Sequence, residues 1–520
     1  MSRLHRWASE TPDKLALIES EGGTSLTFAE LDDRVQRASA WLISEGYEAG
    51  DSIMLLLENR AEIVELGLAA RRAGLYFVVV STHLAPPELA HIVRDSGARM
   101  LIVSDSTVAQ VQPLCAQLPE GTLELVCVGA DAHGLVSYEA CLAAANPRMS
   151  WVARPLGRDM LYSSGTTGFP KGVRRALVPP ERRDDPEPEV VNWQKTFGFD
   201  DSTVYLSPAP LYHAAPLRYV MRTVEVGGTV VMMRKFDPRQ ALALIARHGV
   251  THSQWVPTMF VRMLEIPESE RAVIDIRTMR VAIHAAAPCP PHVKEAMLDW
   301  WGDILVEYYA GSEGFGVTVI GAGEWRSHRG SVGRATLGRI HIVGEDGQEL
   351  PSGEIGKIYF SDGPVFAYWN DPEKTRQAFN DQGWATYGDM GYVDAEGYLY
   401  LADRRTDLIL SGGVNVYPQE IENALALHPD VQDVAVVGVP DPTFGQVPKA
   451  IVQLRDPGNA CEDKALELIA FCEGLLSRVK MPRTIVFEES LPRLETGKLL
   501  RRVLKEKYQT EPDAGHRVRA

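Results

Sequence analysis

The segment Tyr162-Ser163-Ser164-Gly165-Thr166-Thr167-Gly168-Phe169-Pro170-Lys171-Gly172 carries the strongest signal in this chain. It follows Met160-Leu161, an apolar pair typical of the end of a buried strand. Its three glycines let backbone N–H groups converge on an anion, its four hydroxyls add donors, and Lys171 adds a point charge. These features predict a loop that binds a triphosphate or pyrophosphate. Because Gly172 follows Lys171, the segment is not GxxxxGK[ST], and a P-loop NTPase is disfavoured.

Apolar runs alternate with helical patterns on both sides of this loop. Near the N-terminus, Thr27 and Glu30 form a capping-box pattern before a helix that Gly46 ends, and an apolar run at 52–57 precedes a helix over 61–72. Such alternation predicts parallel α/β layers. Further strands are predicted at 76–81, 100–103, 204–206 and 229–233, and further helices at 238–248 and 291–301.

The pattern of predicted strands and helices changes towards the C-terminus. Short strands at 338–343, 356–361 and 397–401 with glycine turns predict a small β-barrel-like part. Strands at 434–439 and 449–454 and a helix over 462–477 predict a small α+β domain. We therefore expect an α/β protein with a large N-terminal domain of layered α/β subdomains, residues 1–404. A small, mobile C-terminal domain, residues 405–520, would follow a hinge at Thr406 in the charged stretch 403–407.

Composition excludes several classes of protein. The chain has 520 residues, of which 45% are hydrophobic and 23% are charged, as in a globular protein of two or more domains. Its formal net charge of -16 disfavours nucleic-acid or anionic-membrane surfaces. The N-terminus has no apolar core of a signal peptide, no run of 18 apolar residues occurs, and the six cysteines form no CxxC pair. We expect a soluble cytoplasmic protein without a membrane span, a zinc site or a disulfide framework; its oligomeric state stays open, with a homodimer as one alternative.

One segment is expected to stand apart from the core. Residues 179–189 (PPERRDDPEPE) are rich in proline and charge. This composition predicts a mobile surface loop, and the sequence assigns it no role.

Six more segments combine small, polar and aromatic residues in characteristic strings. Taken alone, each has an ordinary structural explanation, such as a strand followed by a turn, a packed histidine, a solvated aspartate or a surface lysine. The strings are 209–214 (APLYHA), 285–288 (AAAP), 306–314 (VEYYAGSEG), 384–391 (WATYGDMG), 410–422 (LSGGVNVYPQEIE) and 491–498 (LPRLETGK).

Together with the phosphate loop, these strings resemble, in order, the motifs of the adenylate-forming superfamily of AMP-dependent synthetases and ligases. That superfamily includes acyl-CoA synthetases, adenylation domains of peptide synthetases and luciferases. The resemblance spans about residues 5 to 508. It implies an acid–thiol ligase, which converts a carboxylic acid and ATP into acyl-AMP and pyrophosphate. Transfer of the acyl group to coenzyme A (CoA) then gives acyl-CoA and AMP.

The resemblance also implies roles for individual residues around the nucleotide. Tyr309 would stack on adenine, Asp389 would bind the ribose hydroxyls, and Glu313 would hold Mg²⁺. Catalysis would depend on Lys498, Thr167 and Glu313. The residues implied to bind ATP or AMP are Ser163, Ser164, Gly165, Thr166, Thr167, Lys171, Ala286, Ala287, Pro288, Tyr308, Tyr309, Ser312, Asp389, Arg404 and Lys498. The sequence departs from the usual motifs at Ala310 and Asp403, where glycine is usual, and at Ser312, where threonine is usual.

The resemblance also implies which residues bind the acid and CoA. Lys498 and the CoA loop lie in one small domain and cannot both face one site, so the resemblance implies that this domain rotates between the two half-reactions. The acyl pocket would be formed by His213, Ala214, Trp255, Ala310 and Gly311, and the CoA loop by Ser411, Gly412 and Gly413.

The identity of the acid is not readable from the motifs. Small residues beside tryptophans hint at a bulky hydrophobic acid, and the chain looks like bacterial ligases of lipid metabolism that act on fatty, bile or steroid side-chain acids. Aryl or shorter acids stay open. Rival functions are a stand-alone enzyme that loads a carrier-protein thiol, a luciferase-like oxidation and, in another class, a non-catalytic acyl-nucleotide binding protein.

Overall fold

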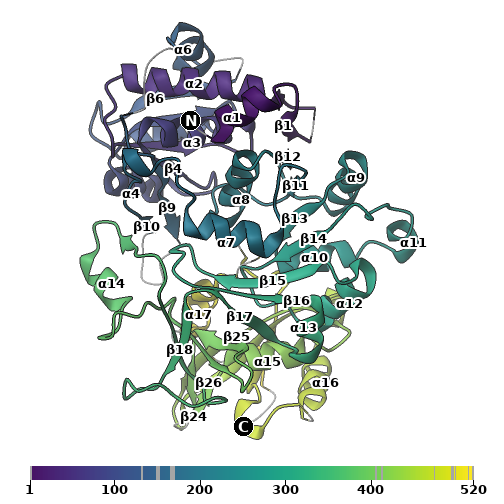
Figure 1. Ribbon diagram of the computed structural model, residues 1–520. Helices are drawn as coiled ribbons and strands as arrows, with labels where there is room; N and C mark the ends of the chain where they lie inside the picture. The colour runs from purple at the N-terminus through teal and green to yellow at the C-terminus, as the bar shows by residue number, and fades with distance from the viewer. Residues whose placement is uncertain are drawn as a thin grey trace.

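The computed structural model describes residues 3–20, 22–129, 133–147, 153–163, 170–404, 407–411, 414–473, 475–493, 497, 499–512 and 514–517. Within these ranges the chain forms α/β layers in its N-terminal three quarters and a separate small α+β unit at its C-terminal end (Figure 1). Figure 1 places the purple N-terminal elements at one end of the molecule and the yellow C-terminal elements at the other.

The first layer is a six-stranded parallel sheet with the order β7-β6-β5-β3-β4-β8. The capping box at Thr27 and Glu30 starts the long helix α2 beside it, as the sequence predicted. The strands are β3 (Ser52–Leu56), β4 (Tyr76–Val79), β5 (Ala98–Ser104), β6 (Glu124–Val128), β7 (Val136–Ser137) and β8 (Arg158–Asp159). The helices of this region are α1 (Arg3–Glu10), α2 (Phe28–Ser44), α3 (Ala61–Ala73), α4 (Pro86–Ser96), α5 (Val111–Cys115) and α6 (Tyr138–Ala144).

The second layer is a long sheet whose centre is parallel, in the order β15-β14-β13-β11-β12-β1. Its strands are β1 (Leu15–Glu19), β2 (Ser25–Thr27), β11 (Val204–Ser207), β12 (Thr229–Met232), β13 (His252–Trp255), β14 (Val281–His284) and β15 (Leu305–Ala310). Its helices are α7 (Pro188–Phe197), α8 (Ala214–Glu225), α9 (Pro238–His248), α10 (Pro257–Leu264), α11 (Glu268–Arg271) and α12 (Pro291–Trp301). Because ligands bind beyond the carboxyl ends of parallel strands, the loops after β13, β14 and β15 are the natural place for a site.

Antiparallel strands extend this sheet into the predicted β-barrel-like part, which encloses a core around Phe315 and Phe360. These strands are β16 (Val317–Gly321), β17 (Ser331–Leu337), β18 (Arg339–Val343), β19 (Gly356–Ser361), β21 (Asp389–Val393) and β22 (Leu399–Arg404). Helices α13 (Ala322–Ser327) and α14 (Pro372–Gln377) accompany them, and a small separate sheet joins β9 (Leu161–Ser163), β10 (Lys171–Arg174) and β20 (Ala367–Tyr368).

The C-terminal unit has its own sheet and its own core, which confirms the predicted small α+β domain. Strand β26 lies at its centre and pairs with β25, β23 and β27. The strands are β23 (Ile409–Ser411), β24 (Val414–Val416), β25 (Val431–Asp441), β26 (Gly445–Leu454), β27 (Thr484–Phe487) and β28 (His516–Arg517). The helices are α15 (Pro418–Leu425), α16 (Glu462–Cys472) and α17 (Arg501–Thr510).

Two expectations from the sequence need correction. The helix predicted over 462–477 ends at Cys472, because the N–H groups of Leu475 and Leu476 both turn back to the Cys472 carbonyl and Leu476 is buried. The segment predicted as a loop at 179–189 is anchored at its end. Glu187 and Glu189 are mostly buried there. Glu187 forms ion pairs with Arg71 and Arg158 of the first layer, and Glu189 forms one with Arg175, which follows β10.

A buried ion pair ties the loops of the second layer together. Lys294 of α12 donates to Glu307 Oε2 of β15 at 2.5 Å, and both side chains are almost inaccessible. His284, at the end of β14, lies 3.8 Å from the same carboxylate oxygen. Burial and the Lys294 ammonium hold the pKa of His284 well below its usual value, so this imidazole is neutral. The pair thus joins α12 to β15, the strand that leads into 308–313, and His284 at the end of β14 lies beside it. Among the described helices, none has the length and apolarity that a bilayer crossing needs.

Replacing Lys294 with methionine should lower the free energy of unfolding by about 3 to 5 kcal/mol, because Glu307 would remain as a buried carboxylate without its ion-pair partner. Calorimetric melting of the variant measures this loss. Lys195→Met, at an exposed position of α7, is the matched control and should change stability by less than about 0.5 kcal/mol.

The double variant Lys294→Met/Glu307→Leu tests the pairing itself. Removing both charges should recover much of the stability that the single change loses. If the two substitutions were simply additive, the ion pair would not be the cause of the loss.

Candidate active site

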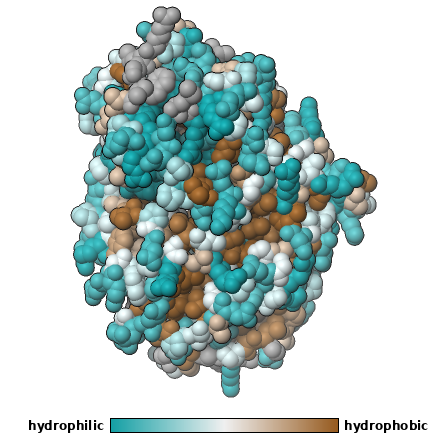
Figure 2. Space-filling view, in the orientation of Figure 1, coloured by the Kyte–Doolittle hydropathy of each residue, from teal (hydrophilic) through white to brown (hydrophobic). Residues whose placement is uncertain are grey.

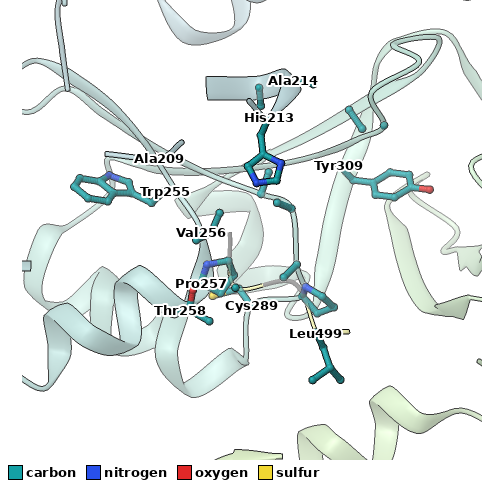
Figure 3. A pocket seen from close by; sticks show the side chains of 18 of the residues that line it. Ala209, His213, Ala214, Trp255, Val256, Pro257, Thr258, Cys289, Tyr309 and Leu499 are labelled. Atoms are coloured by element: carbon teal, nitrogen blue, oxygen red, sulfur yellow. The ribbon is translucent and has the colours of Figure 1, made fainter. Parts of the chain in front are cut away.

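A cavity of about 1760 Å³ opens at the carboxyl ends of β13, β14 and β15, between the large N-terminal region and the C-terminal unit. Figure 3 shows the side chain of His213 pointing into it, with Val256, Pro257 and Thr258 opposite and Leu499 entering from the C-terminal unit. On the face seen in Figure 1, hydrophobic side chains gather across the middle of the molecule (Figure 2). The lining of the cavity combines apolar side chains with polar groups at the ends of these strands.

One wall of the cavity combines an aromatic ring with a carboxylate. Tyr309, in β15, donates its phenolic hydrogen to Asp389 Oδ2 at 2.6 Å, and both residues line the cavity. The backbone of Arg404 lies directly opposite Asp389 in the pairing of β21 with β22. The structure therefore brings together three residues that the sequence predicted to hold the nucleoside.

The loop after β14 forms a neighbouring part of the wall. Ala286, Ala287 and Pro288 all line the cavity. Ala286 has a φ of 76°, a left-handed conformation that costs a residue with a Cβ roughly 1–2 kcal/mol. A glycine would adopt it without strain, so the loop keeps the glycine-type backbone path although the sequence has alanine there.

Gly311 is required by a close aromatic neighbour. A Cβ atom at this position would lie 2.2 Å from the ring of Tyr387. That ring cannot move easily, because it stacks on Phe315 at a centroid distance of 4.0 Å and its hydroxyl donates to the Gly316 carbonyl at 3.0 Å. Only glycine at position 311 therefore lets the turn between Ala310 and Ser312 pass this close to Tyr387.

The turn at Ser312 and Glu313 is held from two sides. Arg218 of α8 donates to the Ser312 carbonyl at 3.0 Å, and Tyr368 donates to Glu313 Oε1 at 2.6 Å. Lys374 of α14 lies over the Tyr368 ring, 4.2 Å from its centroid. Burial and the nearby Lys171 lower the pKa of Lys374, whereas Glu313 raises it. This end of the cavity thus combines a carboxylate with cations, which suits a metal–phosphate ligand.

The chemistry of this end fits Mg²⁺. Glu313 supplies a carboxylate and Ser312 a hydroxyl, and Mg²⁺ prefers oxygen ligands while keeping water and phosphate oxygens in its shell. When bound with ATP, the ion would neutralise charge on the phosphate oxygens.

The phosphate loop itself is only partly described. Ser164, Gly165, Thr166 and Thr167 lie outside the described residues. The strands that flank the loop are antiparallel, with Ser163 opposite Lys171. The Lys171 ammonium forms an ion pair with Asp371, and the cation that lines the described part of the cavity beside Glu313 is Lys374. Sequence reasoning missed Lys374, because no motif marks it and only the fold brings α14 to the loop.

The acyl part of the cavity follows one face of α8. His213 precedes this helix, and Ala214 begins it. Ala310 and Gly311 also line the cavity. Trp255 also lines the cavity, although its indole is fully buried and packs against Phe236 and Trp301.

Lys498 lies outside the described residues, but both of its neighbours line the cavity. A Cβ atom at Gly497 would lie 2.2 Å from Thr258 Oγ1, so this turn touches α10 directly. Arg493 donates to the Gly497 carbonyl at 2.6 Å and pairs with Asp433 of β25. The arginine of the string 491–498 therefore holds the turn in place.

The predicted CoA loop lies elsewhere on the same unit. Ser411 is buried at the end of β23, where it pairs with Gly445, and it does not belong to the described lining of the cavity. Gly412, Gly413 and the hinge residue Thr406 lie outside the described residues. Among the described residues, the turn beside Lys498 therefore contributes to the cavity wall, whereas the hairpin of β23 and β24 does not.

Comparison with known proteins agrees with this geometry. Residues 4–368 match the family model described as AMP-binding enzyme, and residues 420–498 match the AMP-binding enzyme C-terminal domain. The chain is 33% identical to long-chain-fatty-acid–CoA ligase FadD13 of Mycobacterium tuberculosis over 516 residues, 97% of each protein. It is 33% identical to a feruloyl-CoA synthase of an Amycolatopsis species, over 94% of this chain and 95% of that protein. The ATP-bound structure of MatB from Rhodopseudomonas palustris has a TM-score of 0.83 and 28% identity, covering 98% of this chain and 99% of that chain.

The family models, the nearly full-length relatives and the cavity all indicate the same chemistry. Relatives whose names identify them as CoA ligases cover almost the whole chain, so the activity concerns both domains. The chain therefore belongs to the AMP-binding enzyme family, in which it is an ATP-dependent acyl-CoA ligase that uses ATP, Mg²⁺ and CoA.

Proposed function

We propose that the acid activated by this ligase is bulky and largely apolar, such as a fatty acid, a bile acid or the side-chain acid of a steroid. The observation that carries the proposal is an aromatic wall at the inner end of the cavity, formed by Trp193, Phe197, Tyr219 and Tyr308. Trp193 packs edge-on against Tyr219 at 5.5 Å, and Tyr219 stacks on Tyr308 at 6.3 Å between centroids. Rigid rings favour a large apolar ligand through burial of its surface.

The names of two relatives support a substrate of this size. FadD13 is named for long-chain fatty acids, and the Amycolatopsis enzyme for feruloyl-CoA.

All six cysteines are free thiols, which supports a reducing compartment, and we place the enzyme in the cytoplasm.

In the first half-reaction the acid's carboxylate attacks the α-phosphorus of ATP, and pyrophosphate leaves. We assign binding of the departing charge to Lys498, Thr166 and Thr167, together with the carboxylate of Glu313 that holds Mg²⁺. The contact of Gly497 with Thr258 supports this assignment, because it places the turn that precedes Lys498 against the cavity wall.

In the second half-reaction the CoA thiol attacks the carbonyl of acyl-AMP, and AMP leaves. We propose that residues 405–520 turn about Thr406 between the two steps, so that Ser411, Gly412 and Gly413 replace the Lys498 turn at the cavity. Asp407 supports this position of the hinge, because Lys505 and Arg501 of α17 bind its carboxylate at 2.9 and 3.4 Å. From Asp407 onward the chain is therefore fastened to the small domain.

A panel of acids tests the proposed substrate class. Acetate, octanoate, dodecanoate, palmitate, benzoate, ferulate and cholate would each be incubated with ATP, Mg²⁺ and CoA, and AMP and thioester would be measured. Among the fatty acids, kcat/KM should rise by about fourfold for each methylene that the cavity buries, since burial contributes about 0.8 kcal/mol per methylene. Acetate or benzoate as the best substrate would overturn the proposal of a bulky apolar acid. A thioester formed only on a carrier protein would favour the rival thiol acceptor.

Lys498→Ala should reduce ATP–pyrophosphate exchange by about 100-fold or more, because one group that stabilises the transition-state charge is lost. Binding of ATP, measured by calorimetry, should stay close to that of the unmodified enzyme, and so should thioester formation from synthetic acyl-AMP. Lys507→Ala, which changes a half-exposed ammonium of α17, is the matched control. Normal exchange in the Lys498 variant would refute this role.

Gly413→Trp should have the opposite pattern, since an indole in the loop would obstruct the approach of the CoA thiol. Thioester formation from acyl-AMP should fall at least about tenfold, while pyrophosphate exchange stays largely intact. Equal losses in both half-reactions would remove the assignment of 411–413 to CoA.

A further inference from the structure

Within the described part of the chain, Arg222 lines the cavity and has no carboxylate partner. Ala214, Arg218 and Arg222 follow one another at intervals of four residues, so they lie on one face of α8, and all three line the cavity. Along the helix axis, Arg222 lies about 12 Å beyond Ala214. Arg222 thus stands at the far end of the acyl pocket, two turns from His213.

The other arginines of this region are already paired. Five arginines and four carboxylates meet between the first layer and α8. Arg218 binds Asp159 at 2.8 Å, and Arg175 binds Glu189 at 2.5 Å. The full set comprises Arg71, Arg158, Arg175, Arg218, Arg222, Asp159, Glu187, Glu189 and Glu225.

Arg222 is the exception in this cluster. Among the described residues, no carboxylate lies within 4 Å of it and no hydrogen-bond acceptor binds it. The central carbon of its guanidinium lies over the ring of Trp193, 5.9 Å from the ring centroid. Burial and the nearby Arg218 lower the pKa of Arg222, and the carboxylates of Glu189 and Asp159 offset this only in part. The cluster therefore keeps one positive charge that is not neutralised, and that charge faces the cavity.

We propose that the acid carries a second acidic group at the end remote from its reacting carboxylate, and that Arg222 binds this group. The inference rests on the proposed function and refines it: the body of the acid lies along the aromatic wall, and a carboxylate or sulfonate lies about 12 Å from the beginning of α8. The planar guanidinium offers parallel donors to such a group, so it selects an acidic end over an apolar one. An acid with a purely apolar end would leave the cation buried and uncompensated.

Matched pairs of acids test the inference. Octanoate, decanoate and dodecanoate would be compared with the dicarboxylic acids of the same lengths, by ATP–pyrophosphate exchange and by thioester formation. The unmodified enzyme should have a higher kcat/KM for at least one dicarboxylic acid than for its monocarboxylic partner. Arg222→Met should lower kcat/KM for that diacid by about 10- to 100-fold, as expected for loss of a charged hydrogen bond, and leave the monoacid unchanged or improved. Arg222→Lys should recover part of the loss.

Thermal melting separates this role from a structural one. Arg222→Met should not lower the melting temperature, because no ion pair is broken, whereas Arg218→Met should lower it by removing the contacts to Asp159 and Ser312. The diacid alone should raise the melting temperature of the unmodified enzyme and not that of Arg222→Met. If monoacids are preferred and Arg222→Met affects both series equally, the second acidic group is refuted while the ligase stands. If none of the acids releases AMP, the proposed substrate class itself fails.

Discussion

One guanidinium joins the parts of the molecule that must cooperate at the cavity. Arg218 lies on α8, binds Asp159 at the end of the first sheet, and donates to the Ser312 carbonyl in the turn after β15. Although burial opposes the charge, Asp159 raises the pKa of Arg218, and Arg218 in turn holds the pKa of the buried Asp159 well below its usual range. Because separating such a pair would leave a buried charge uncompensated, the three elements keep one relative position. The turn that carries Glu313 is thus placed by the first layer as well as by its own strand.

The C-terminal unit obeys a similar constraint within its own sheet. The turn beside Lys498 is fixed to β25 through Arg493 and Asp433, and the hairpin of β23 and β24 is fixed to the same sheet through β26. Two loops fastened to one sheet cannot exchange places by local motion. The rotation of residues 405–520 that we propose would present them in turn to one cavity.

Local patterns predicted much of the fold, because they act within a few residues. Helices α9 and α12 begin and end at the predicted residues, since proline starts each and glycine follows each. The motif strings also predicted that Tyr309, Asp389 and Glu313 would meet. Long-range partners could not be predicted in this way. Nothing near Lys374 or Glu187 in the sequence indicates that folding brings one beside Tyr368 and the other beside Arg71. Nor does the sequence around Trp255, which lines the cavity, indicate that its indole packs against Phe236 and Trp301.

Specificity in such a pocket depends on two kinds of interaction with unequal power. The rings of Trp193, Tyr219 and Tyr308 favour binding of apolar surface. However, an apolar wall distinguishes two acids that differ by one methylene by only about 1–3 kcal/mol. A buried cation discriminates more sharply, since a substrate that fails to pair with it leaves a charge uncompensated. The aromatic wall therefore sets the size of the acid, and Arg222 would set its identity. The four carboxylates of the cluster are consistent with this division, because among the described residues they pair with Arg71, Arg158, Arg175 and Arg218 and leave Arg222 without an ion-pair partner.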